Sequence, residues 1–132
     1  MKTIGEFYRE KVLSLPKKLL TKMEAPYLFP ENMEVERDLF GWKLHYNKLG
    51  RKSREFFECR SEEEARYLKV LFGAGMSEVH VPKDDEYLKS ILPEIERLKT
   101  KIDEIVNSYL ESILDRKIRE RVRHEVFMEI TK

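Results

Sequence analysis

The feature that most constrains the fold is a run of apolar residues in the C-terminal third of the chain. Its members recur every three or four residues: Ile91, Ile95, Leu98, Ile102, Ile105 and Tyr109. This spacing is typical of one long helix with the apolar seam of a coiled coil. A helix of residues 93–130 would be about 57 Å long and would extend beyond a sheet of short strands. The seam must therefore pack on the chain's own helices, on a second chain, or on both.

The N-terminal quarter of the chain predicts two helices and a connector. The pair Thr3 and Glu6 has the spacing of a capping box, which predicts a helix from about Ile4. Ser14 and Pro16 are typical of a second helix start, and we expect that helix to reach Glu24. The stretch APYLFPEN then contains two prolines and indicates a non-helical connector.

From about Asp38 the apolar period changes from that of a helix to that of a strand. Apolar and polar residues alternate from Trp42 to Tyr46, and the aromatic stretch 54–59 supplies a partner strand. NKLGRKS would then form the hairpin loop, with Gly50 in a left-handed conformation. A second capping box at Ser61 predicts a helix to Gly73, and EVHVP (residues 78–82) predicts another strand.

The order strand, helix, strand with tight loops favours a right-handed parallel crossover. The predicted fold is therefore α+β, with a small mixed sheet (a β-hairpin plus one βαβ crossover), N-terminal helices and a long C-terminal helical tail. We expect residues 1–82 to form the core domain and residues 83–132 to form a helical segment that packs on that core or on a second chain. Pro93 predicts a kink or a fresh helix start.

Composition excludes several classes of protein. Hydrophobic residues make up 41% of the chain and the net charge is only +1, so an unfolded chain is not expected. Glutamine is absent and charged residues reach 39%, which is typical of a thermophile. A single cysteine excludes an internal disulfide framework. No run is apolar enough for a transmembrane helix or a signal peptide, so we expect a cytoplasmic protein with no membrane role.

Two basic clusters suggest nucleic-acid binding. In the loop 47–54 the candidates are Lys48, Arg51, Lys52 and Arg54. On the helix face 116–124 they are Arg116, Arg119 and Arg123. Basic side chains on a hairpin tip or on one helix face are able to contact phosphates. The alternatives are a solvated turn for the first cluster and, for the second, a solvated helix face or pairing with the acidic segment 61–115.

Enzymatic and metal chemistry receive weaker support. Cys59 precedes a helix N-terminus, which lowers a thiol pKa, and His80 ends the next strand, so a Cys–His nucleophile pair is conceivable. No motif of a thiol enzyme surrounds Cys59, and buried free cysteine is common, so a structural thiol is the alternative. The histidines and Cys59 lack the short spacing of a zinc site, and no cofactor motif is present.

These patterns favour a non-enzymatic interaction protein that associates with itself as a homodimer. The expected interface is the last five residues of the seam: Ile95, Leu98, Ile102, Ile105 and Tyr109. Nucleic-acid binding through the two basic clusters is the alternative, and a thiol-dependent enzyme at Cys59 is the third interpretation. The sequence names no particular protein partner, ligand or substrate.

Overall fold

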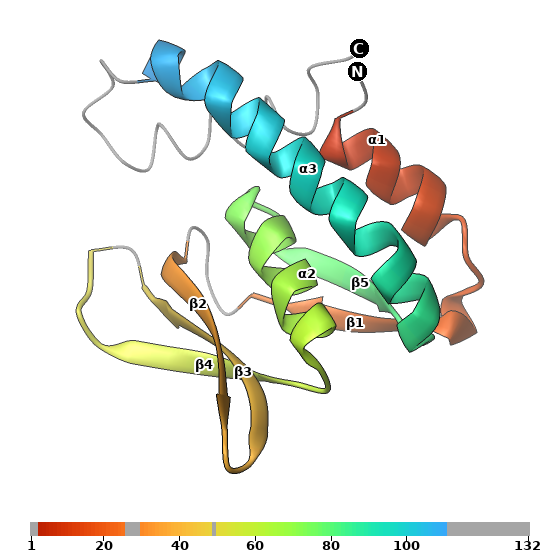
Figure 1. The fold of residues 1–132 in the computed structure, drawn as a ribbon, viewed down its shortest axis with the longest axis horizontal. Helices are drawn as coiled ribbons and strands as arrows, with labels where there is room; N and C mark the ends of the chain where they lie inside the picture. Colours follow the sequence, from red (N-terminus) through yellow and green to blue (C-terminus); the bar gives the residue numbers. More distant parts are fainter. Residues whose placement is uncertain (1–2, 26–29, 49, 111–132) are drawn as a thin grey trace.

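A computed structural model describes residues 3–25, 30–48 and 50–110. In the last turns of the final helix, the side chains of residues 105, 106 and 108–110 are not described. The fold class, α+β, is confirmed. Along the chain the elements are α1 (Ile4–Tyr8), a π-helical turn (Arg9–Leu13), a 3₁₀ turn (Lys17–Leu19), β1 (Leu20–Glu24), β2 (Glu31–Asp38), β3 (Gly41–Asn47), β4 (Arg54–Cys59), α2 (Glu62–Gly73), β5 (Glu78–Pro82) and α3 (Asp85–Leu110) (Figure 1).

The described strands form two antiparallel sheets instead of one mixed sheet. One sheet has the order β2-β3-β4, and the other pairs β1 with β5. The predicted parallel crossover is wrong, because β4 and β5 belong to different sheets and β5 pairs antiparallel with β1, from Leu20 opposite Pro82 to Glu24 opposite Glu78. The partner of β5 thus comes from residues that lie nearly 60 positions earlier, a pairing that local spacing does not reveal.

The predicted second helix, from Pro16 to Glu24, is also wrong. After one 3₁₀ turn the chain enters β1, whose residues alternate in burial beside β5. Strand β2 was missed as well. The end of the predicted connector, Glu31 and Asn32, belongs to it, while residues 26–29 lie outside the described part. Asn32 has a φ of 51°, and the β2–β3 register shifts beside it, so a bulge interrupts the regular alternation there.

The predicted helix starts after Thr3 and Ser61 are confirmed. The Glu6 N–H donates to Thr3 Oγ1 at 3.0 Å, and the Glu64 N–H donates to Ser61 Oγ at 3.1 Å. Both helices therefore begin where a side-chain oxygen satisfies a free backbone donor. Gly50 has a φ of 77°, as expected for the left-handed position of the β3–β4 loop.

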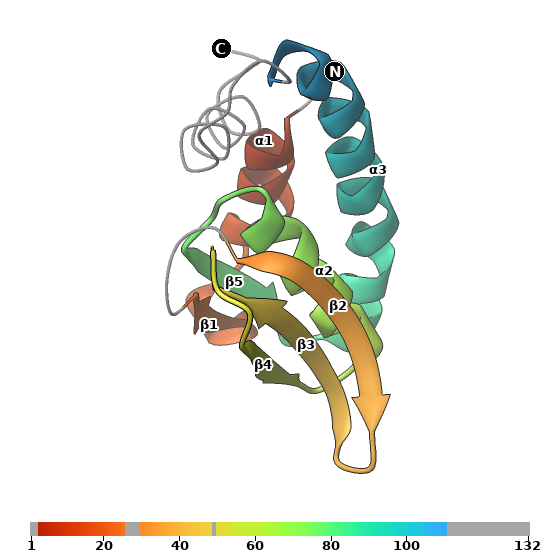
Figure 2. The ribbon, with the colours of Figure 1, turned by 90° about the vertical axis from the view of Figure 1, so that its left-hand side faces the viewer.

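Helix α3 continues from Asp85 through Pro93 to Leu110, so no fresh start occurs at the proline. It lies across α1 and α2, on the side of the molecule away from the three-stranded sheet (Figures 1 and 2). Ile91, Leu92 and Ile95 around the proline are buried in the same core as α1, α2 and β5. Their burial offsets the hydrogen bond that proline cannot donate.

Candidate interaction surfaces

The described part of the seam lies inside the chain's own core. The exposed fractions of Ile95, Leu98 and Ile102 are 0%, 2% and 0%, and all three belong to one cluster with residues of α1, α2 and β5. This placement fits the alternative in which the seam packs within one chain. The side chains of Ile105 and Tyr109 lie outside the described residues, and association of two chains stays a prediction.

The basic loop offers fewer free charges than its sequence suggests. Arg54 donates to the Asn47 side chain and to the Asn32 carbonyl, both at 2.6 Å, and Lys48 lies 3.8 Å from a Glu55 carboxylate oxygen. Arg51 and Lys52 are exposed.

No ion pair joins Arg51 or Lys52 to another described residue. The other predicted contacts, Arg116, Arg119 and Arg123, lie outside the described part of the chain. Among the described residues, Arg51 and Lys52 are therefore the part of the predicted phosphate surface that is exposed and outside an ion pair.

Cys59 and His80 have separate surroundings. Burial, and then the nearby Glu64 carboxylate, raise the pKa of the Cys59 thiol to about 12, so the nucleophilic thiolate is strongly disfavoured. His80 lies on β5, and its Nδ1 is 3.4 Å from the Tyr8 hydroxyl. The His80 N–H donates to that hydroxyl at 2.7 Å, and Tyr67 donates to the His80 carbonyl at 2.8 Å. Two tyrosines thus anchor the backbone of β5 at this residue.

The β2–β3 turn carries a feature that the sequence reasoning missed. Its two central residues, Leu39 and Phe40, are 98% and 88% exposed, and we call them the hairpin tip. The Phe40 N–H donates to Asp38 Oδ1 at 2.8 Å, and Gly41 has a φ of 121°. Asp38 and Gly41 therefore hold the turn, and its geometry requires no apolar side chain at the two tip positions.

Lys43 connects the hairpin tip to the outer face of the three-stranded sheet. Its ammonium is 2.6 Å from Asp38 Oδ2, and this hydrogen bond is the main reason why the pKa of Asp38 is lowered. The same ammonium lies 5.5 Å from the ring centroid of Phe40 and 4.7 Å from that of Phe56, which is 50% exposed. A cation held over two aromatic rings keeps the apolar groups of this end together.

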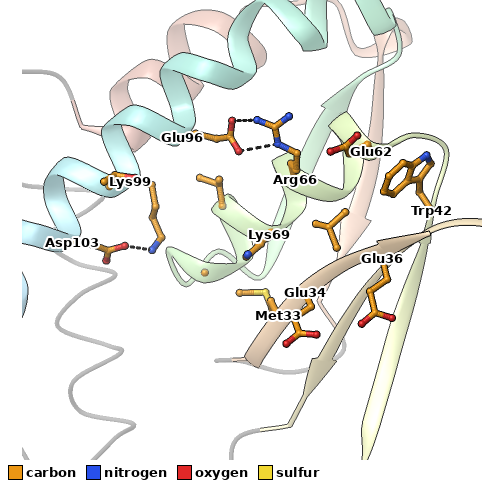
Figure 3. A pocket seen from close by; sticks show the side chains of 14 residues that line it. Met33, Glu34, Glu36, Trp42, Glu62, Arg66, Lys69, Glu96, Lys99 and Asp103 are labelled. Atoms are coloured by element: carbon orange, nitrogen blue, oxygen red, sulfur yellow. Dashed lines mark hydrogen bonds and ion pairs between the residues drawn. The ribbon is translucent and has the colours of Figure 1, made fainter. Parts of the chain in front are cut away.

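A cleft of about 800 Å³ opens between β2 and the helices α2 and α3 (Figure 3). Met33, Val35 and Val70 supply apolar lining, and Trp42 lies at one end. Ion pairs occupy the helical wall: Arg66 binds Glu96 through two hydrogen bonds, and Lys99 donates to Asp103 at 2.6 Å. Gly73 allows β2 to lie close, since a Cβ there would be 3.2 Å from Met33 Cε.

Comparison with protein families, curated proteins and solved structures finds no match for this chain. Among the described residues, no three His, Cys, Asp or Glu side chains gather in a way that would hold a metal ion. No helix within residues 3–25, 30–48 and 50–110 is long and apolar enough to cross a bilayer.

Proposed function

We propose that this chain is a non-enzymatic interaction protein that inserts its hairpin tip into a partner protein. The observation that carries the proposal is the near-complete exposure of Leu39 and Phe40 on a turn that Asp38 and Gly41 already hold. Turn positions are usually polar, because an apolar side chain there gains nothing from folding. Two large apolar residues at the end of a hairpin are typical of an anchor that fills a pocket in another molecule.

The size of the tip favours an anchor over a symmetric contact between two copies. A stable protein interface buries about 800 Å² on each partner, which is more than two side chains supply. The tip therefore needs a partner that surrounds it. Lys43, between the rings of Phe40 and Phe56, would bring the neighbouring face of the sheet into the same contact.

A photoreactive phenylalanine analogue at position 40 tests this proposal. The control analogue stands at Leu13, which is 46% exposed and ends the π-helical turn that follows α1. Helix α1 lies away from the β2–β3 hairpin (Figure 1). We expect a discrete protein adduct from position 40 in extracts of the source cells and none from position 13. The protein captured in this adduct, once purified, should bind the native chain. The double variant L39S/F40S should lose affinity for that protein, and L13S should keep it.

Burying a leucine and a phenylalanine together is worth about 3–6 kcal/mol, so the double variant should bind about 10² to 10⁴ times more weakly. Equal binding by L39S/F40S and the native chain would contradict the proposal. Co-sedimentation with anionic lipid vesicles that the double change abolishes would overturn it too, because the tip would then enter a membrane surface and not a protein.

Three further expectations remain proposals. Self-association through the seam would now depend on residues beyond Ile102, since the earlier ones are buried in the chain. Nucleic-acid binding is favoured by one observation: Arg51 and Lys52, beside Gly50, are exposed and form no ion pair with another described residue. A cytoplasmic setting, in which a lone thiol such as Cys59 stays reduced, completes the proposal.

A further inference from the structure

The cleft beside β2 runs along the edge of the three-stranded sheet. Four consecutive residues of β2, Met33 to Glu36, line it. Successive side chains of a strand point to opposite faces, so four in a row contact one cleft only where the cleft follows the edge of the strand. Figure 3 shows the same division, because Glu34 and Glu36 point away from α2.

This edge has no partner among the described residues. β2 is the outer strand of its sheet and pairs with β3 alone. Apart from its pairing with β3, the backbone of residues 33–37 forms no hydrogen bond with another described segment, and the nearest such contact is the one from Arg54 to the Asn32 carbonyl. In an antiparallel pair every other residue directs its N–H and C=O away from its neighbour strand. The edge therefore presents a row of donors and acceptors to the cleft.

The two sides of the edge differ in chemistry. On the side facing the helices, Met33 and Val35 are half-buried and line the cleft together with Val70. On the outer side stand Glu34 and Glu36. Glu34 lies 3.5 Å from Arg54, whereas the neighbour of Glu36 is His45 at 3.4 Å, a residue that carries charge only when protonated. The edge is thus apolar on one face and acidic on the other.

We propose that the β2 edge binds an extended peptide segment in which apolar residues alternate with lysine or arginine. The peptide would add as a fourth strand, through main-chain hydrogen bonds to β2. Its apolar side chains would lie in the cleft against Met33 and Val35, and its cations would stand opposite Glu34 and Glu36, where cross-strand pairs of opposite charge are favourable.

The same carboxylates disfavour a second copy of this chain as the occupant. Antiparallel pairing of two β2 strands centred on Val35 would place Glu34 of one copy beside Glu36 of the other, twice over. Like charges directly opposite one another destabilise a strand pair. A basic strand from another molecule would pair with β2 without this repulsion between carboxylates.

The test uses three labelled peptides, capped at both ends, and fluorescence anisotropy with the full chain. One alternates valine and lysine, the second has the same composition with the valines and lysines in separate blocks, and the third alternates valine and glutamate. We expect the first to bind, the block isomer to bind at least about tenfold more weakly, and the acidic peptide not to bind. Hydrogen exchange should slow at alternate amides of residues 33–37 when the first peptide is bound.

Charge-reversed variants locate the site. E34K/E36K should bind the alternating peptide at least about tenfold more weakly, and E34Q/E36Q serves if the reversal disturbs folding. The matched control is E58K, on the same sheet face but on β4, the opposite edge, and it should bind within about twofold of the native chain. The variant L39S/F40S should also bind normally, because this site is independent of the hairpin tip.

Equal affinity for the alternating peptide and its block isomer would overturn the inference, since simple charge attraction would then suffice. Protection of amides outside β2, or an equal loss in E58K, would overturn it as well. A failure of these peptides leaves the hairpin-tip proposal standing, and failure of the tip variants leaves this one standing.

Discussion

The burial of the seam can be tested by truncating Ile102 in steps. Its side chain is fully enclosed among residues of the same chain. Replacement by valine removes one buried methylene and should lower the free energy of unfolding by about 0.5–1.5 kcal/mol. Replacement by alanine leaves a larger cavity and should cost about 2–5 kcal/mol. Adding L98A one helical turn away should cost a similar amount, although the two changes share neighbours and need not add.

A typical domain has only about 5–15 kcal/mol of stability, so the double variant should be close to unfolding. The assay is urea unfolding, followed by the fluorescence of the single tryptophan, Trp42, and by far-ultraviolet circular dichroism. The control is K101A, because Lys101 is the exposed neighbour of Ile102 on α3 and its truncation should stay within about 0.5 kcal/mol.

Light scattering on the same samples separates the two interpretations of the seam. If the seam is core, the mass per particle of the folded protein should not change along the series, while the urea midpoint falls. The reasoning would be refuted by alanine variants as stable as K101A whose mass drops from two chains to one. That result would mean that the residues contribute to an interface between chains and not to the interior of one.

Three further predictions concern single groups. Cys59, with its pKa raised to about 12, should react with iodoacetamide at pH 8 at least about 100-fold more slowly in the folded chain than in urea, and comparable rates would contradict its burial. If the β3–β4 loop contacts phosphates, R51A/K52A should reduce the slope of log affinity against log salt by about two, measured on single- and double-stranded DNA; no binding at low salt would leave the loop a solvated turn. Burial raises the pKa of Tyr8 and Tyr67, so the unfolded state loses these protons first as pH rises past about 10, and the urea midpoint should fall between pH 9 and 11; a flat profile would contradict this linkage.

Elements whose signals are local were predictable from the sequence. The two predicted N-cap hydrogen bonds act over three residues, and both are present. The hairpin of β3 and β4 follows from an alternation of apolar residues and a glycine between the strands. Each of these signals acts over a few residues, so one segment of the sequence contains all the information that it needs.

The elements that sequence reasoning missed depend on distant partners. Leu20–Glu24 has apolar residues that suit a short helix as well as a strand, and pairing with β5 decides the outcome. β2 has only Met33 and Val35 as apolar residues on its inner face, too few for a clear period next to the bulge at Asn32. Because the cleft needs β2, α2 and α3 together, no single segment could have predicted it.

The hairpin tip is different, because its signal is present in the sequence. Asp38 and Gly41 match the first and last positions of a tight turn, and a turn so held places no demand on the two residues between them. Comparing each apolar residue with what its local conformation requires therefore singles out Leu39 and Phe40 from a short stretch of sequence. Both residues expose apolar surface that favours aggregation, and neither belongs to the buried core. A residue that folding does not need and that solubility opposes is best explained by a contact with another molecule.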